Sequence, residues 1–194
     1  MKKYLLLICF LSLSSLAFAN VVTYTIDFEQ YAAYTQITNQ YAASDGVVFT
    51  NALQLVVPFY DYFDYPPHSG SGVVTNDPND PIQVNFTNSM VTVHSVSAWY
   101  TDPDGIVVDV YFINGLHLAT YTFGAVYGTT AQFSITSGPN IGWITIADAN
   151  SNADNETVDD LSFTTTPVPE PASLALMGSG ALGLAGFLRR RLFR

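Results

Sequence analysis

Hydrophobic and polar positions alternate through most of residues 20–166, and this period of two predicts β-strands rather than helices. A sustained period of 3.6 residues is not visible. Only 29–41 has room for a helical turn, and its threonines and tyrosines argue against one. This part of the chain is also rich in Val, Ile, Thr, Tyr and Phe, which pack well on a pleated surface.

Turn signals separate these alternating runs, and Asn114-Gly115 is the strongest of them because this pair suits a two-residue hairpin turn. A long polar and aromatic loop at 58–80 interrupts the series, with room for a short strand at 73–74. The strands predicted are 21–28, 47–49, 53–57, 82–86, 91–100, 106–113, 116–123, 131–136, 141–147 and 158–163. Because hairpins dominate and no crossover helix is available, we expect an all-β fold, an antiparallel β-sandwich.

The first 19 residues have the three parts of a secretory signal peptide. A positive start precedes an apolar run at 4–13, and Ala17-Phe18-Ala19 is a small-residue cleavage site. The exported chain would then begin at Asn20. Cys9 is the only cysteine and lies in the segment to be removed. The exported part is therefore expected to form no disulfides and to depend on its core.

The carboxyl end, 167–194, has a proline-rich start, an apolar middle and a basic end. Its three closely spaced prolines cannot continue a strand or a helix interior, so the preceding fold must stop there. The run 172–188 carries no charge and would cover roughly 26 Å as a helix, close to the thickness of a bilayer core. Arg189, Arg190 and Arg191 are typical of the cytoplasmic end of a transmembrane helix.

The order of Pro169-Glu170-Pro171, an apolar helix over 172–188 and three closing arginines resembles the PEP-CTERM sorting signal of Gram-negative bacteria. The resemblance implies an exosortase as partner, a membrane-embedded transpeptidase-like enzyme that removes the helix and passes the protein to the cell surface. It also implies a precursor anchored transiently in the inner membrane, with its body in the periplasm and its carboxyl end in the cytoplasm. The alternative is an ordinary single-span tail anchor after a proline-rich stalk. The chain thus divides into a signal peptide (1–19), an exported domain (20–166) and a sorting signal (167–194).

The charge distribution separates the exported domain from the two ends. All six basic residues lie in the end segments: Lys2, Lys3, Arg189, Arg190, Arg191 and Arg194. Of the 16 acidic residues only Glu170 lies outside 20–166, which leaves 15 in the exported domain and none of the Lys or Arg. Nucleic acid and anionic lipid are poor partners for such a domain, because binding to them depends on basic residues. Its carboxylates must be solvated, hydrogen-bonded or paired with a cation from outside.

The exported domain carries a second resemblance. Its segments resemble, in this order, segments of many bodies with PEP-CTERM tails: Ile26-Asp-Phe-Glu29, Tyr41-Ala-Ala-Ser-Asp-Gly-Val-Val-Phe49, Pro67-His-Ser-Gly70 and Val158-Asp-Asp-Leu-Ser-Phe163. Such bodies look like jelly-roll sandwiches of the carbohydrate-binding-module kind. The resemblance therefore implies a jelly-roll-like arrangement of the predicted sandwich.

In such jelly rolls a structural calcium often ties the first strand to the last, and calcium takes carboxylate oxygens. The expected ligands are Asp27, Glu29, Asp159 and Asp160. Alternation puts the last two on opposite faces, so at most one of them would join Asp27. The alternative is that these are solvated carboxylates at the rim of the sandwich.

Two further acidic stretches are interpreted as turns. Asp102-Pro-Asp-Gly105 begins like a calcium-binding loop but lacks the later ligands and the closing glutamate. Asp148, Asp154 and Glu156 lie among Asn and Ser residues that favour a turn.

The sequence offers little support for catalysis. His68, His94 and His117 are far apart, and the last two lie in predicted strands. His68 and Ser69 are neighbours whose side chains would rarely face one another, and the nucleophile motif G-x-S-x-G is absent. With 16 acids, a carboxylate pair for glycoside hydrolysis is too unspecific a signal. We expect no catalytic residues, and a secreted hydrolase is the least favoured function.

Sugar binding is the more natural use of the aromatic loop at 58–80. Tyr60, Tyr62 and Tyr65 offer rings for stacking on a sugar, with Asp61, Asp64 and Asn76 as hydrogen-bonding groups. The alternative is packing within the loop. Trp99 and Trp143 lie in predicted strands and are expected in the core, with stacking on a sugar face as the alternative for either of them. The sequence therefore predicts a structural or adhesive protein of an extracellular polysaccharide matrix, with a carbohydrate-binding module acting through this loop as the alternative.

Overall fold

The computed structural model describes residues 21–76, 80–87, 91–150 and 156–167, together with five positions near the carboxyl end: Gly178, Gly180, Ala181, Leu188 and Arg189. The chain forms two compact units, the body at 21–166 and a unit made of the two chain ends. The five positions of the end unit have helical geometry. No helix among the described residues is long and apolar enough to cross a membrane.

Several predictions about the chain ends concern residues outside the described ones. They are the signal peptide at 1–19, the tripeptide Pro169, Glu170 and Pro171, the basic residues Arg190 and Arg191, and most of the apolar run 172–188. The described residues therefore do not test these features, which stay predictions.

The body is built from eleven strands, and its described residues include no helix. The strands are β1 (Val22–Ile26), β2 (Gln36–Ile37), β3 (Val47–Thr50), β4 (Ala52–Val56), β5 (Gly72–Asn76), β6 (Ile82–Phe86), β7 (Val91–Asp102), β8 (Ile106–Phe112), β9 (His117–Phe123), β10 (Val126–Asp148) and β11 (Thr157–Pro167). The segment 29–41 holds bends, turns and β2 rather than a helical turn. The apolar pair at 73–74 belongs to a five-residue strand, so the aromatic loop is shorter than the sequence suggests.

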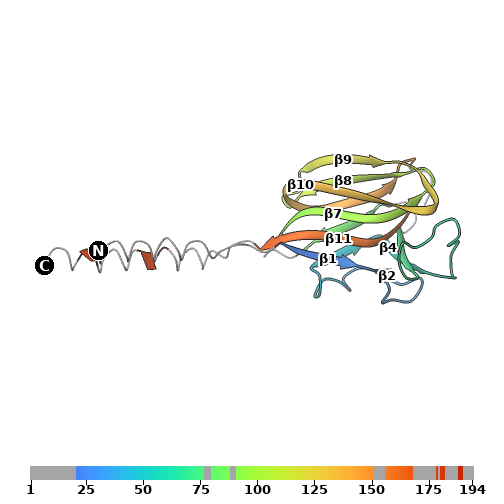
Figure 1. Ribbon diagram of the computed structural model, residues 1–194, viewed down its shortest axis with the longest axis horizontal. Helices are drawn as coiled ribbons and strands as arrows, with labels where there is room; N and C mark the ends of the chain where they lie inside the picture. The colour runs from blue at the N-terminus through green and yellow to red at the C-terminus, as the bar shows by residue number, and fades with distance from the viewer. Residues whose placement is uncertain are drawn as a thin grey trace, which may run out of the picture. The chain divides into compact units, whose positions relative to one another are not determined.

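The strands are arranged in two layers. One layer has the order β2-β4-β5-β11-β7 and then the first part of β10, with β1 beside β11. The other has the order β3-β6, the second part of β10, β8 and β9. The pairs β1–β11, β4–β5, β3–β6 and β8–β9 are all antiparallel. Figure 1 shows β8 and β9 at one side of the body and β1 and β11 at the other. The predicted antiparallel sandwich is confirmed.

Strand β10 connects the two layers. Its residues from Ala131 to Thr136 pair with β7, whereas those from Trp143 to Asp148 pair with β8, and the register shifts between these parts. The second part also pairs with β6. The two separate strands predicted at 131–136 and 141–147 are therefore one continuous strand that contributes to both layers.

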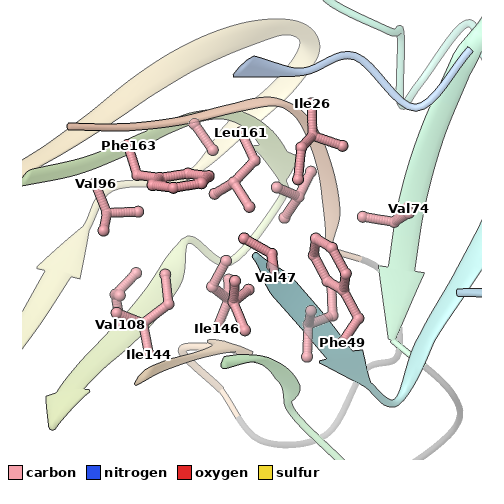
Figure 2. Close-up of a cluster of buried hydrophobic side chains, with 14 of the residues drawn as sticks. Ile26, Val47, Phe49, Val74, Val96, Val108, Ile144, Ile146, Leu161 and Phe163 are labelled. Carbon is pink, nitrogen blue, oxygen red and sulfur yellow. The ribbon is translucent and has the colours of Figure 1, made fainter. Parts of the chain in front are cut away.

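The core lies between the layers. Ile26, Leu161 and Phe163 from β1 and β11 face Val108 of β8 and Ile144 of β10 across it (Figure 2). All five are buried. They occupy alternate positions of their strands, as the period-two pattern predicts, so each strand presents its other face to the outside.

Candidate functional site

The most elaborate polar arrangement of the body surrounds residues 68–72, the segment that leads into β5. Glu29 binds one end of this segment, and Asp159 and Asp160 bind the other. Glu29 follows β1, while the two aspartates belong to β11. The 68–72 segment thus links the end of the first strand to the last strand through side-chain hydrogen bonds.

Glu29 accepts three hydrogen bonds from this segment. Its Oε1 atom accepts from the backbone N–H groups of Ser71 at 2.9 Å and Gly72 at 2.7 Å. Its Oε2 atom accepts from the Ser71 hydroxyl at 3.1 Å. Gly70 has φ +51°, and a Cβ atom there would lie 2.3 Å from the Glu29 carboxyl carbon. Glycine suits position 70 because of this positive φ, and its lack of a side chain lets the Glu29 carboxylate come close to the backbone.

Asp159 and Asp160 hold the other end of the segment. Asp159 Oδ2 accepts from the backbone N–H groups of His68 at 2.8 Å and Ser69 at 2.9 Å. Asp160 Oδ2 lies 2.6 Å from His68 Nδ1, and its Oδ1 atom accepts from the Ser69 hydroxyl at 3.0 Å. The His68 ring stacks on Trp99 with 3.7 Å between ring centres and 7° between planes. One carboxylate therefore binds the backbone, and the other binds the two side chains.

A break in strand alternation brings the two aspartates to the same place. Asp160 has φ +46°, a left-handed conformation that is unusual for a residue other than glycine. On either side of the pair, Val158 and Leu161 are both buried although they are three positions apart. The strand thus contains a local irregularity, so the prediction that Asp159 and Asp160 point to opposite faces is wrong.

The electrostatics of this site are dominated by burial of carboxylates. Burial raises the pKa of Asp159, which is 2% exposed, to about 6; the charge of Asp160 acts in the same direction, and the N–H group of Ser69 opposes it. Burial also raises the pKa of Tyr60, and the charges of Asp159 and Glu29 add to this effect. Tyr60 therefore lies against the carboxylate side of the site, and its buried hydroxyl has no hydrogen-bond partner.

The four expected calcium ligands are not gathered into one group among the described residues. His68, Asp159 and Asp160 have potential ligand atoms within 4.8 Å of one another. Glu29 instead binds the far end of the 68–72 segment, and Asp27 is exposed, with its Oδ1 atom accepting from the Glu29 N–H group at 3.3 Å. Protein donors already serve the oxygens of Glu29, Asp159 and Asp160. A calcium ion at these carboxylates stays a prediction.

The arrangement of His68 and Ser69 differs from that of a nucleophile and its base. Both side chains bind the same carboxylate, Asp160, and the Ser69 hydroxyl donates to that carboxylate rather than to the imidazole. A nucleophile activated by histidine needs a direct contact between the two. His94 lies in β7 and His117 in β9, as predicted, where they contact Thr166 and Asp109 respectively.

The three tyrosines of the aromatic loop have separate environments. Tyr62 stacks on Phe63 at 4.4 Å, and Tyr65 meets the edge of Tyr127 at 6.0 Å. The Tyr60 hydroxyl is buried, as described above. The Gly128 N–H group donates to the Asp64 carbonyl at 2.9 Å, which holds the loop against the first residues of β10. Packing within the loop and against its neighbours therefore accounts for these rings better than one shared stacking surface.

Both tryptophans lie on outer faces of the sandwich, so the prediction that they are core residues is wrong. Trp99 lies between the buried residues Ala98 and Tyr100, and Trp143 precedes the inward-facing Ile144. Trp143 stacks on Tyr111 of β8 with 5.0 Å between ring centres and 11° between planes. That a residue lies in a strand does not show whether its side chain points to the inner or the outer face of the sheet.

Trp143 and Tyr111 belong to a row of side chains across the outer face of one layer. Trp143 is the register partner of both Tyr111 on β8 and Asn85 on β6, and Tyr111 is the partner of His117 on β9.

The neighbouring row places Thr145 opposite both Gln83 and Asp109, and Asp109 opposite Thr120. Aromatic rings thus lie beside hydrogen-bonding groups on one sheet face. Trp143 is a candidate for sugar stacking in the sequence, but its neighbours in this row could not be predicted, because they come from three other strands.

Comparison with known proteins identifies the carboxyl end. Residues 167–191 match the PEP-CTERM protein-sorting motif. No curated protein sequence matches the chain significantly. Among solved structures, the chain is similar to the K2 cleaved adhesin domain of Lys-gingipain, with a TM-score of 0.51 and 14% identity over 73% of this chain and 99% of that domain.

Two carbohydrate-binding modules are similar at lower scores. A family 29 module from Piromyces equi has a TM-score of 0.44 and 12% identity, over 75% of this chain and 91% of the module. A family 35 module from Paenibacillus barcinonensis has a TM-score of 0.38 and 18% identity, over 73% of this chain and 97% of the module. The likeness to the adhesin domain concerns the fold alone. The chain therefore ends in a PEP-CTERM protein-sorting motif, which follows a jelly-roll-like, antiparallel β-sandwich body.

Proposed function

We propose that this protein is exported, sorted by an exosortase-like transpeptidase and delivered to the cell surface, where it has a structural or adhesive role in extracellular polysaccharide. The observation that carries the proposal is the PEP-CTERM motif at 167–191. The precursor would be anchored in the inner membrane through 172–188, with Arg189, Arg190 and Arg191 at its cytoplasmic end. The role is proposed to be non-enzymatic.

The acidic body fits a role outside the cell. It carries 15 acidic residues and none of the Lys or Arg of the chain, which opposes binding to nucleic acid and anionic lipid. A high net charge of one sign also keeps a domain soluble. The proposed processing would remove all six basic residues with the two end segments.

Processing is tested by mass spectrometry of the carboxyl terminus of the protein recovered from the producing cell, with the membrane and surface pools analysed separately. The parent chain is expected to lack the peptide that contains Arg194. Glu170→Ala alters the recognised tripeptide and is expected to leave that peptide in place, whereas Ser173→Ala, just beyond the tripeptide, serves as the matched control and is processed normally. An intact Arg194 in the surface pool of the parent would contradict sorting and leave a plain membrane anchor.

A second candidate function is binding of a polysaccharide on the outer face that carries Trp143. The stacked Trp143–Tyr111 pair beside His117 and Asn85 favours it, because sugars bind to aromatic faces flanked by hydrogen-bonding groups. This placement differs from the predicted site in the aromatic loop, where Tyr60, Tyr62 and Tyr65 are engaged in packing.

Glycan binding by three forms of the protein separates these sites. Trp143→Ala is expected to weaken binding by about tenfold, corresponding to roughly 1.4 kcal/mol for a lost stacking contact. Tyr62→Ala, which removes an aromatic ring from the loop, is expected to leave affinity unchanged. The reverse pattern would return the site to the loop, and no binding by the parent across a polysaccharide panel would eliminate a carbohydrate-binding role.

A further inference from the structure

Two buried aspartates outside the sites described above lie at one end of the sandwich. Asp102 ends β7 and is 0% exposed, and Asp148 ends β10 and is 7% exposed. Their surroundings are joined by backbone contacts: Ile106 is the register partner of Asp148, and the Ala149 N–H group donates to the Gly105 carbonyl at 2.8 Å. The two acidic stretches predicted to form separate turns are therefore neighbours.

Each aspartate has one oxygen with a donor and one without. Asp102 Oδ1 accepts from the Asp104 N–H group at 2.7 Å, and Asp148 Oδ1 accepts from the Asn150 N–H group at 2.5 Å. The Oδ2 atoms of both Asp102 and Asp148 are buried and have no hydrogen-bond partner. A buried charged oxygen without a partner is strongly unfavourable, so two of them at one place require an explanation.

The body contains no side chain to neutralise these charges. It has no Lys or Arg. Its three histidines are engaged elsewhere, His68 with Asp160, His94 with Thr166 and His117 with Asp109. Where both carboxylates are ionised, a positive charge for Asp102 and Asp148 must therefore come from outside the body.

The two carboxylates also interact with each other. Burial raises the pKa of Asp102 to about 6, and the charge of Asp148 raises it further, while the N–H groups of Asp104 and Gly105 oppose the shift. The backbone contacts between the β7–β8 turn and the end of β10 bring the two aspartates to the same end of the sandwich. Hard divalent cations prefer carboxylate oxygens, and calcium tolerates ligands from separate chain segments because its coordination geometry is flexible.

We propose that Asp102 and Asp148 are ligands of a calcium ion through their Oδ2 atoms, at the junction of the β7–β8 turn and the end of β10. This site shares no residue with the calcium site predicted at Asp27, Glu29, Asp159 and Asp160. The ion supplies the charge that the body lacks and joins two segments 46 positions apart in the chain. Backbone carbonyls and water complete its coordination.

Thermal unfolding of the full chain in detergent tests the site, with calcium chloride compared against a chelator. Calcium at about 100 times its dissociation constant is expected to raise the midpoint by on the order of 5 °C. Asp102→Asn and Asp148→Asn keep the size of the side chain and are expected to lose most of this shift. Asp109→Asn, a change at a half-buried aspartate on the outer face, is expected to keep it.

The direction in which Asp102→Asn shifts the thermal midpoint in chelator provides a second readout. In chelator, Asp102→Asn removes one of two uncompensated buried charges, so its midpoint is expected to equal or exceed that of the parent. In calcium the order reverses. A mutation that merely damages the fold would lower the midpoint under both conditions.

Three results would overturn the proposal. The first is an identical parent midpoint with calcium and with chelator. The second is that both asparagine variants keep the full calcium shift. The third is that Asp159→Asn abolishes the shift while Asp102→Asn does not. The last result would assign calcium to the 68–72 segment instead. Equilibrium calcium titration of the folded proteins adds a direct count, with one site fewer expected in Asp102→Asn than in the parent.

Discussion

Phe28→Ala is expected to lower the free energy of unfolding by about 4 kcal/mol, the loss typical of a fully buried phenylalanine. Phe28 is 0% exposed and meets Tyr41 at 6.0 Å and Phe49 at 5.7 Å, both edge to face. Removing its ring leaves a cavity against two aromatic side chains. Backbone strain does not change the free energy of unfolding between the parent and Phe28→Ala, because φ +53° is as unusual for alanine as for phenylalanine.

Urea denaturation at fixed calcium concentration measures this effect. Phe59→Ala is the matched control, since the same side chain is removed from a position that is 62% exposed, and a change below about 0.5 kcal/mol is expected. Phe28→Leu keeps part of the volume and should lie between the two. A loss for Phe28→Ala no greater than that of Phe59→Ala would mean that this aromatic group does not support the core.

Gly72→Ala is expected to destabilise the body by about 3 kcal/mol, because the added methyl group would overlap the backbone. A Cβ atom at Gly72 would lie 2.2 Å from the Phe28 carbonyl oxygen and 2.8 Å from Gln54 Nε2. These atoms cannot move apart freely, since the buried Gln54 amide donates to that same carbonyl at 2.8 Å. The Gly72 N–H group is in turn held by Glu29.

Gly124→Ala provides the control for this change. No atom outside the neighbouring residues lies within 4 Å of a Cβ atom at Gly124. Alanine there restricts the unfolded chain, so its midpoint in urea is expected to stay the same or rise slightly. Equal behaviour of the two variants would show that the close approach of residues 28, 54 and 72 is not needed for stability.

The sequence predicts the strands well where alternation is unbroken. Ile106, Val108 and Val110 are buried in β8 as their spacing requires, and the Asn114-Gly115 hairpin joins β8 to β9. Alternation cannot reveal that a strand changes its partners along its length, and β10 was therefore expected as two strands. Pairing partners depend on contacts between distant segments, which a local pattern does not contain.

The candidate sites were predictable only in part. The segments 26–29, 67–70 and 158–163 were singled out in the sequence, and the structure brings them together around the 68–72 segment. The roles of the side chains there could not be foreseen, because the conformation of Asp160 breaks the alternation on which the expectation rested. The approach of the β7–β8 turn to the end of β10, which carries Asp148, depends equally on long-range strand register.

The position of β11 determines how the body would carry a load applied at its carboxyl end. This strand lies between β7 on one side and β1 and β5 on the other, and the sorting motif begins where it ends. Hydrogen bonds of an antiparallel ladder run across the strands, so a pull along β11 would shear several of them at once instead of opening them one by one. The register from Val22–Thr165 to Ile26–Leu161 would bear that force together. A domain pulled by this end would therefore resist mechanical unfolding.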